Sequence, residues 1–324
     1  MKRNTVVSVL LLVILLGRGT AAAAESTIVR DKLEGEMEIS TPLQRVVFLS
    51  LYELIPVLQL WDRAVGVNRW AFQSELLKDF PQLAAIPSVG TADRVNVESL
   101  LALRPDLVIT WPYKPEEVEF IRKKGIRTMA VDPQNLKELV EVLDLCGRIF
   151  RKEERAAQVL FLMEEIFQLV KSKTADVTDH RKKKVLWLWL KPVTVSGKGG
   201  LQSDLTRMAG AVNVAEGLPL RYADVSMEVI IAWNPDVVFI WGNARYGVQD
   251  LQDNPQWRAV RAIRNGRVFK APPWSTWSPA SAVLALWMAQ KIYPERFEGM
   301  GLQDRADEFF RKCYGICPKE RIFD

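Results

Sequence analysis

Few side chains of this chain could do covalent or metal chemistry. Its 324 residues include one histidine and three cysteines, which excludes most histidine-based catalysis and most His/Cys zinc sites. The histidine, His180, lies in a run of charged residues that predicts a solvated surface. Asp132 and Asp224 are candidate acids for an exported enzyme, but neither has an evident base or nucleophile as a partner. We therefore expect a binding protein with no catalytic residue, no metal ligand and no cofactor, and we keep an exported enzyme as the alternative.

Aromatic and cationic residues follow the ends of several predicted strands. The chain has 11 tryptophans, and indole rings combine a large apolar area with a polar edge. Arginine and lysine among such rings favour an anionic or carboxylate-bearing ligand of some size. The predicted ligand-binding residues are Tyr52, Arg69, Trp70, Trp111, Tyr113, Lys198, Trp241, Arg245, Trp274 and Trp277. The alternative is that each ring only packs its loop onto its own lobe.

Other basic and aromatic residues of the chain are not predicted to bind the ligand. Arg94 and Arg221 lie in the same loop regions as the predicted ligand-binding residues. Trp187 and Trp189 alternate within a predicted strand, so we expect them in the core or on the sheet surface. The Gly-Lys-Gly-Gly stretch around Lys198 lacks the spacing and the Ser/Thr of a phosphate-binding loop, which argues against a nucleotide there.

Two glutamates occupy equivalent positions in a duplicated phrase. Residues 95–110 read VNVESLLALRPDLVIT, and residues 225–240 read VSMEVIIAWNPDVVFI. In each copy a cap residue, Asn96 or Ser226, begins a short helix that carries Glu98 or Glu228 in its first turn, where an acid stabilises the helix dipole. A proline then ends the helix, and a buried strand follows. The duplication predicts two lobes of similar construction.

The elements around these residues predict an α/β fold with two parallel-sheet α/β lobes joined by a long interdomain helix. The predicted strands cover residues 45–50, 64–67, 107–110, 126–131, 184–190, 237–241 and 267–271. Predicted helices begin near Tyr52 and cover 115–124 and 201–209, and the periodic stretch 135–176 indicates a long helix that bridges the lobes. The predicted domains are an N-terminal lobe at 25–150, a linking helix at 151–176 and a C-terminal lobe at 177–324. One large doubly wound domain is the alternative.

The first 24 residues have the pattern of a secretory signal peptide. Lys2 and Arg3 precede an apolar run at 6–16, and small residues ending at Ala24 predict cleavage before Glu25, with an uncleaved anchor as the alternative. Three of the basic residues behind the formal net charge of +5 lie in this segment, so the remaining chain is near neutral and a general nucleic-acid binder is disfavoured. We expect a protein that is exported to the periplasm, soluble and without a lipid anchor.

Export changes the interpretation of the cysteines. Cys313 and Cys317 flank Tyr-Gly-Ile near the C-terminus, and in an oxidising compartment they could form a disulfide that closes a short loop. Two free thiols are the alternative. Cys146 lies in an apolar-periodic stretch, so we expect it to be buried and inert.

The chain resembles the periplasmic binding proteins of iron-siderophore and cobalamin ABC uptake systems. The resemblance rests on the signal peptide, the paired E-x-x-x-A-x-x-P-D phrases, the bridging helix and the segment that begins at Trp277-Ser-Pro-Ala. It implies that Glu98 and Glu228 dock onto arginines of a dimeric membrane permease. It also implies a monomeric receptor for a preformed iron-siderophore-type chelate, to which the protein supplies no metal ligand. Molybdate or tungstate, haem and a corrinoid are the alternative ligands, and the histidines of related zinc and manganese binders are absent.

Overall fold

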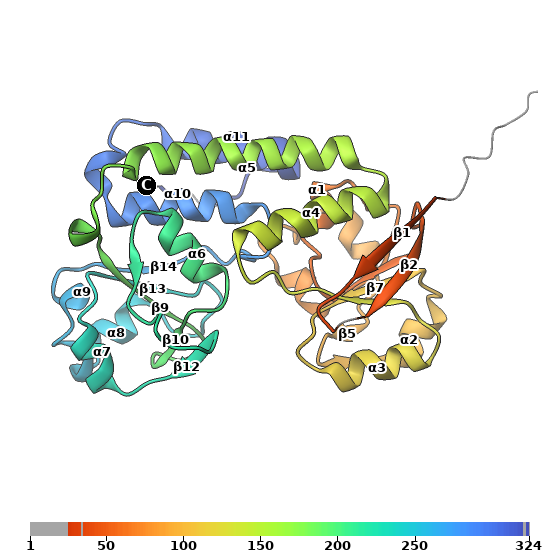
Figure 1. The fold of residues 1–324 in the computed structure, drawn as a ribbon, viewed down its shortest axis with the longest axis horizontal. Coiled ribbons are helices and arrows are strands. Elements are labelled where there is room, and N and C mark those ends of the chain that lie inside the picture. The colour runs from red at the N-terminus through yellow and green to blue at the C-terminus, as the bar shows by residue number, and fades with distance from the viewer. Residues whose placement is uncertain (1–24, 34, 320–321, 324) are drawn as a thin grey trace, which may run out of the picture.

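The computed structural model describes residues 25–33, 35–319 and 322–323, so the predicted signal peptide lies outside the described residues. Two α/β lobes, each built on its own sheet, lie side by side beneath a layer of long helices (Figure 1). No helix in the described part of the chain is both long enough and apolar enough to cross a membrane. The predicted fold class, two α/β lobes joined by a long helix, is confirmed.

The N-terminal lobe is built on a four-stranded parallel sheet. Its strands are β3 (Val46–Phe48), β4 (Ala64–Val67), β7 (Leu107–Thr110) and β8 (Thr128–Ala130), in the order β4-β3-β7-β8. Every residue of β7 is buried, as expected for a parallel strand covered on both faces. Around the sheet lie α1 (Leu54–Val57), η1 (Arg69–Gln73), η2 (Pro81–Ala85), α2 (Val97–Ala102), α3 (Pro115–Lys123) and the hairpins β1 (Glu25–Arg30)–β2 (Glu36–Thr41) and β5 (Gly90–Thr91)–β6 (Arg94–Val95).

The C-terminal lobe contains a mixed six-stranded sheet. Its strands are β9 (Lys184–Leu188), β10 (Thr194–Ser196), β11 (Val212–Asn213), β12 (Tyr222–Asp224), β13 (Val237–Ile240) and β14 (Val268–Lys270). Strands β11, β13 and β14 run parallel to their neighbours, whereas β10 pairs antiparallel with both β9 and β12. The helices of this lobe are η3 (Asp179–Arg181), α6 (Leu201–Met208), α7 (Met227–Trp233), α8 (Val248–Asp253), η4 (Pro255–Trp257) and α9 (Arg261–Arg264).

The periodic stretch 135–176, predicted as a long bridging helix, forms two helices, and the second lies within the predicted linking helix at 151–176. Helix α4 (Leu136–Phe150) ends where Arg151 takes a left-handed conformation, and the chain reverses into α5 (Glu153–Thr174). A Cβ on Gly147 would lie only 2.6 Å from the Cβ of Ala156, so the glycine lets the two helices approach closely. Helix α5 has 22 residues, which corresponds to about 33 Å at ~1.5 Å per residue, and it spans both lobes (Figure 1).

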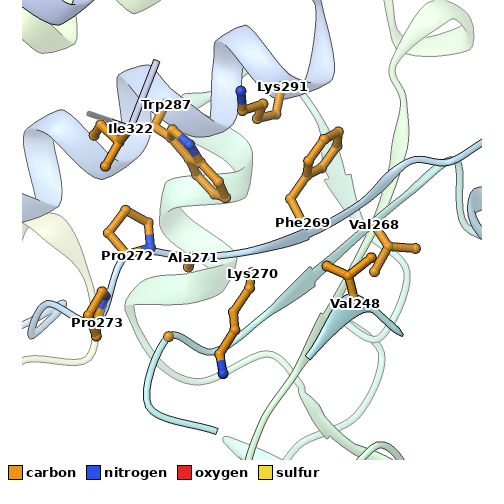
Figure 2. Close-up of a pocket in the computed structure, with 11 residues that line it drawn as sticks. Val248, Val268, Phe269, Lys270, Ala271, Pro272, Pro273, Trp287, Lys291 and Ile322 are labelled. Carbon is orange, nitrogen blue, oxygen red and sulfur yellow. The ribbon is translucent and has the colours of Figure 1, made fainter. Parts of the chain in front are cut away.

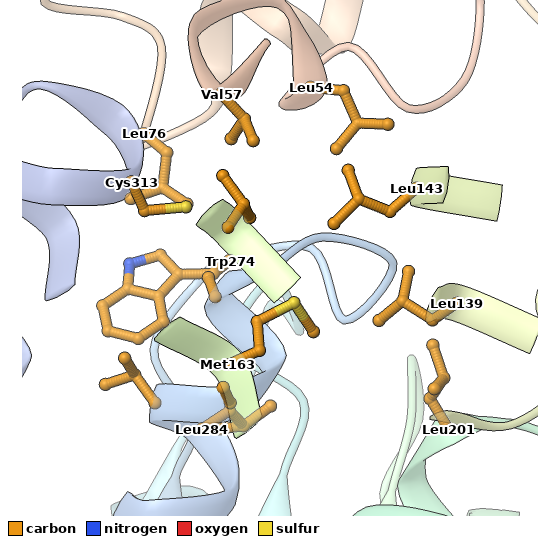
Figure 3. Packing of buried hydrophobic residues seen from close by; sticks show 14 of the residues in the cluster. Leu54, Val57, Leu76, Leu139, Leu143, Met163, Leu201, Trp274, Leu284 and Cys313 are labelled. Carbon is orange, nitrogen blue, oxygen red and sulfur yellow. The ribbon is translucent and has the colours of Figure 1, made fainter. Parts of the chain in front are cut away.

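Two further helices complete this layer, α10 (Ala280–Ile292) and α11 (Leu302–Tyr314), with η5 (Pro294–Arg296) between them. Eleven of the thirteen residues of α10 are buried, because the helix packs against α5, α6 and α11. Figure 3 shows that the resulting core joins Leu54 and Val57 of α1 to Met163 of α5 and Leu284 of α10. One hydrophobic core therefore continues from one lobe into the other.

The two predicted cap residues lie at the N-termini of α2 and α7, but only one makes the capping hydrogen bond. Asn96 accepts from the amide of Ser99 at 3.0 Å, whereas the Ser226 side chain makes no capping hydrogen bond to the backbone of α7. The predicted disulfide is wrong. Cys313 and Cys317 are free thiols rather than a disulfide. Cys313 faces the core from the last turn of α11, whereas Cys317 follows the helix end at Gly315 and is exposed. Cys146 is buried, as predicted.

Candidate ligand-binding site

Residues from the two lobes meet at the ends of several strands. Trp111 and Tyr113 follow β7 and Asp132 follows β8, while Arg221 immediately precedes β12 and Trp277 follows β14. We call these five residues the interlobe cluster. Because ligands of parallel α/β folds bind at the carboxyl ends of strands, this cluster lies where a ligand site is expected.

The guanidinium of Arg221 is the centre of the interlobe cluster. Its Nη2 donates to Asp132 Oδ2 at 2.8 Å, and its Nη1 donates to the Tyr113 hydroxyl at 2.7 Å. That hydroxyl in turn donates to Asp132 Oδ1 at 3.1 Å. Three hydrogen bonds thus form a closed ring of contacts between one residue of the C-terminal lobe and two of the N-terminal lobe.

Aromatic rings enclose this charged group. The guanidinium carbon of Arg221 lies 5.8 Å from the centroid of the Tyr113 ring and 5.9 Å from that of the Trp277 ring, within the range of cation–π attraction. Trp111 is nearly parallel to Tyr113 with centroids 5.7 Å apart, and it also contacts Trp277 at 4.9 Å. The indole N–H of Trp277 donates to the carbonyl of Pro133 at 3.2 Å, which fixes that ring against the N-terminal lobe.

The ion pair in the cluster is largely withdrawn from water. The side chain of Asp132 is 8% exposed and that of Arg221 is 13% exposed. Burial raises the pKa of Asp132, and the charge of Arg221 together with hydrogen bonds from Tyr113 and Gln134 acts in the opposite direction. A buried carboxylate needs such partners, because an isolated charge there would be costly.

A second group of rings, the C-lobe stack, consists of Trp189, Tyr222 and Trp241. Trp189 is stacked against Tyr222 at 4.3 Å and against Trp241 at 3.9 Å between centroids. The Tyr246 hydroxyl donates to the backbone carbonyl of Trp189 at 2.9 Å. Tyr222 directly follows Arg221 in the chain, so the C-lobe stack adjoins the interlobe cluster. Burial raises the pKa of the Tyr222 hydroxyl, and the nearby charge of Arg221 opposes this shift.

The structure separates the predicted ligand-binding residues into groups. Trp111, Tyr113 and Trp277 belong to the interlobe cluster, and Trp241 belongs to the C-lobe stack. Tyr52 is half-buried and packs against the core. Three cationic residues and one tryptophan are exposed and lie outside both groups: Arg69, Lys198, Arg245 and Trp70.

Trp274 does not share the environment of Trp277. It is 5% exposed and packs edge-on against Phe310 of α11 at 4.7 Å, inside the core that joins the lobes (Figure 3). The expectation that it stands in the same crevice as the other rings is therefore corrected. The two tryptophans are three residues apart in one loop, and only the path of that loop distinguishes them.

Four residues of these groups are not among the predicted ligand-binding residues. Trp189 was assigned to the interior of a strand ending at Leu190, but β9 ends at Leu188, so Trp189 belongs to the loop at the strand end. Asp132 was considered only as an enzyme acid, and Arg221 only as one cation among several. Tyr222 had no distinguishing signal, because its role depends on the antiparallel pairing of β12 with β10.

A buried carboxylate connects the lobes beside Tyr52. Glu53 Oε1 accepts hydrogen bonds from the Ser74 hydroxyl at 2.9 Å and from the backbone amide of Ser275 at 3.3 Å. Glu53 is 3% exposed, and its Oε2 has no hydrogen-bond partner. Burial raises the pKa of Glu53 to about 7, although the hydrogen bonds from Ser74 and Ser275 oppose the shift.

The two glutamates of the duplicated phrase are exposed. Glu98 lies in the first turn of α2 and Glu228 in the first turn of α7. Figure 1 shows α2 and α7 on different lobes, both on the side of the molecule away from α5. A hydrogen bond with Ser226 lowers the pKa of Glu228.

A pocket of about 500 Å³ lies elsewhere, on the C-terminal lobe between β14 and α10 (Figure 2). Val268, Phe269 and Trp287 contribute apolar walls, and the ammonium of Lys291 lies 5.8 Å from the centroid of the Phe269 ring. None of the predicted ligand-binding residues lines this pocket. Within the described ranges there is no group of three or more His, Cys, Asp or Glu side chains that could hold a metal ion.

Comparison with known proteins places these features in a family context. A model of the periplasmic binding protein family matches residues 46–274. The chain is 25% identical to the molybdate-binding protein MolA of Haemophilus influenzae, over 94% of this chain and 95% of that protein. It is 24% identical to the Fe(3+)-citrate-binding protein YfmC of Bacillus subtilis, over 81% and 83% of the two chains. The crystal structure of Helicobacter pylori CeuE with Ni(II) bound is similar with a TM-score of 0.80 and 28% identity, covering 90% of this chain and 96% of that one.

Proposed function

The chain belongs to the periplasmic binding protein family, and on this basis we propose that it captures a preformed metal chelate between its lobes and delivers it to an ABC permease. The interlobe cluster is the observation that carries the proposal, because residues of both lobes meet there around a guanidinium and three aromatic rings. The protein performs no chemistry on the ligand. It acts in the periplasm as a monomer.

The chemistry of the surroundings favours an anionic chelate of the iron-siderophore type. Flat rings in the interlobe cluster and in the C-lobe stack offer apolar area to the organic part of such a complex. Arg69, Lys198 and Arg245 are exposed cations, and we propose that they pair with peripheral carboxylate groups of the chelate. A preformed chelate already satisfies its metal ion, so it requires no metal ligand from the protein.

Molybdate or tungstate is the second candidate ligand. It is favoured by the similarity to MolA, which extends over 94% of this chain. A small oxyanion would use hydrogen-bond donors rather than ring surfaces, so the two candidates make different demands on the same region.

The permease is expected to contact both lobes. Glu98 and Glu228 are exposed, occupy equivalent positions of the duplicated phrase, and lie on helices on the side of the molecule away from α5. A two-lobed receptor that meets a two-fold symmetric channel presents one such acid to each half.

Equilibrium dialysis against a panel of ligands tests the proposed function. The panel contains ferric citrate, a ferric hydroxamate complex, molybdate, tungstate, haem and cobalamin, with quenching of tryptophan fluorescence as a second readout. We expect a ferric chelate to bind at micromolar concentration or below and to quench the fluorescence. Failure of every panel member to bind at millimolar concentration would contradict the proposal, and tight binding of molybdate alone would establish the second candidate.

A further inference from the structure

Arg221 is engaged inside the protein rather than presented to a ligand. Its guanidinium donates to Asp132 and Tyr113, and two ring centroids lie within 6 Å of its carbon atom. Only 13% of the side chain is exposed. An anion that is to bind Arg221 must therefore compete with a carboxylate already in place.

The charge of this ion pair is balanced within the protein. Asp132 contributes one negative charge at 2.8 Å from the Arg221 nitrogen, so the pair offers no net positive charge to an incoming ligand. A small dianion at this position would lie close to Asp132 and would be repelled by it, because charges interact strongly where water is excluded. Arg69, Lys198 and Arg245, by contrast, are exposed cations outside the cluster.

A large complex avoids this competition. It can spread over the Trp189 and Trp241 rings and reach the exposed cations with peripheral groups, while the Arg221–Asp132 pair stays intact. A small oxyanion must therefore compete with Asp132 for Arg221, whereas a large chelate can bind without contacting Arg221. The difference rests on Asp132, which is the only carboxylate in the interlobe cluster.

We propose that Asp132 is a specificity-determining residue, which holds Arg221 in an internal ion pair and so selects against small, densely charged oxyanions in favour of large anionic chelates. This inference rests on the proposed function, because it concerns the ligand of the same site. Asp132 acts through Arg221 and through its own charge, and the chelate does not displace it.

Calorimetric titration of the full chain with molybdate and with ferric citrate tests the role of Asp132. The Asp132→Asn variant removes the charge and keeps the shape of the side chain. We expect the ratio of its molybdate affinity to its ferric citrate affinity to exceed the wild-type ratio by about tenfold or more. The reason is that repulsion between one unit charge and an anion in a site that excludes water costs at least about 1.4 kcal/mol. Adding Arg221→Gln to Asp132→Asn should abolish the gain.

Two matched variants separate charge from other effects. Tyr113→Phe removes the hydrogen bonds that the hydroxyl makes with Arg221 and with Asp132 but keeps the carboxylate, so the affinity ratio should not shift toward molybdate. Asp224→Asn removes an exposed carboxylate from β12, outside the cluster, and controls for the general loss of one negative charge. If Asp132→Asn does not fold, Asp132→Ser replaces it, because a serine hydroxyl can still accept a hydrogen bond from Arg221.

Several results would overturn the inference. These are an unchanged or lower affinity ratio in Asp132→Asn, an equal gain in Tyr113→Phe, an equal gain in Asp224→Asn, or tight molybdate binding by the wild type that Asp132→Asn weakens. Failure of the proposed function has a different signature. If the wild type binds neither probe and Asp132→Asn gains molybdate binding, the ligand assignment is wrong while the role of Asp132 stands.

Discussion

At the scale of single residues, Trp189 holds the C-lobe stack together, because it is the ring in contact with both of the others. Replacing it with leucine removes two ring contacts and the flat surface that they support. We expect Trp189→Leu to weaken binding of the preferred chelate by about tenfold, corresponding to ~1.4 kcal/mol. Fluorescence titration measures this loss, and Trp70→Leu, which changes an exposed ring outside both groups, provides the comparison. Equal effects of the two substitutions would show that the stack has no special role.

Glu53 should make the stability of the protein depend on pH. Its pKa is about 7 in the folded protein, above the ordinary value of 4.5, so folding binds a proton. The resulting stabilisation is complete below about pH 4.5 and is lost as the pH rises through 7, with a maximum of about 3 kcal/mol. Tyr52 and Tyr314 interact with this carboxyl group, but burial raises the pKa of both hydroxyls, so they stay neutral over this range.

Urea unfolding at pH 5 and pH 8 measures the contribution of Glu53. Glu53→Gln keeps the size of the side chain and removes its titration. The wild type should lose the Glu53 contribution to the free energy of unfolding between pH 5 and pH 8, and the variant should lose none of it. An identical pH dependence in both proteins would show that the carboxyl group titrates normally.

At the scale of elements, the sequence predicted the helices and strands whose bounds are set by a local pattern of apolar residues. Strands β4 and β7 have the predicted bounds, because short buried runs of apolar residues define them. The reversal between α4 and α5 has no local signal, because helical periodicity continues through Arg151, no proline follows α4, and Gly147 lies inside the helix rather than at its end. The contrast between Trp274 and Trp277 was missed for a related reason: a loop has no period that tells which ring faces the core.

The junction of α4 and α5 should be sensitive to one methyl group. Gly147→Ala places a Cβ at 2.6 Å from that of Ala156, so one helix must move. The gain in helix propensity offsets part of the cost, and we expect a net loss of about 1–2 kcal/mol in the free energy of unfolding. Chemical denaturation measures it. Gly217→Ala, where a Cβ would meet nothing within 4 Å, should change stability by less than ~0.5 kcal/mol. Equal losses in both variants would contradict close packing at Gly147.

At the scale of the whole molecule, the duplicated phrase places one glutamate on each lobe, and both helices lie on the side away from α5 (Figure 1). If these acids dock the receptor onto a permease, Glu98→Ala combined with Glu228→Ala should reduce ligand uptake by about tenfold or more while ligand affinity is retained, since each truncated charge contact of this kind costs at least about 1 kcal/mol. Transport into vesicles or cells measures uptake, and calorimetry measures affinity.

The control for docking uses glutamates on the opposite side. Glu164 of α5 and Glu308 of α11 are exposed, and their helices belong to the layer away from α2 and α7. Glu164→Ala with Glu308→Ala removes the same charge from the molecule and should leave uptake unchanged. Normal uptake by the Glu98/Glu228 variant, or an equal loss in the control, would exclude the docking assignment.

The location of the metal in a complex tests the central claim most directly. Crystals grown with ferric citrate, and separately with molybdate, allow the metal to be located from its anomalous scattering. We expect one strong peak between the lobes, adjoining the interlobe cluster and the C-lobe stack. A peak in the pocket beside Lys291 and Trp287, or none near Arg221 and Trp189 with either ligand bound in solution, would contradict the claim.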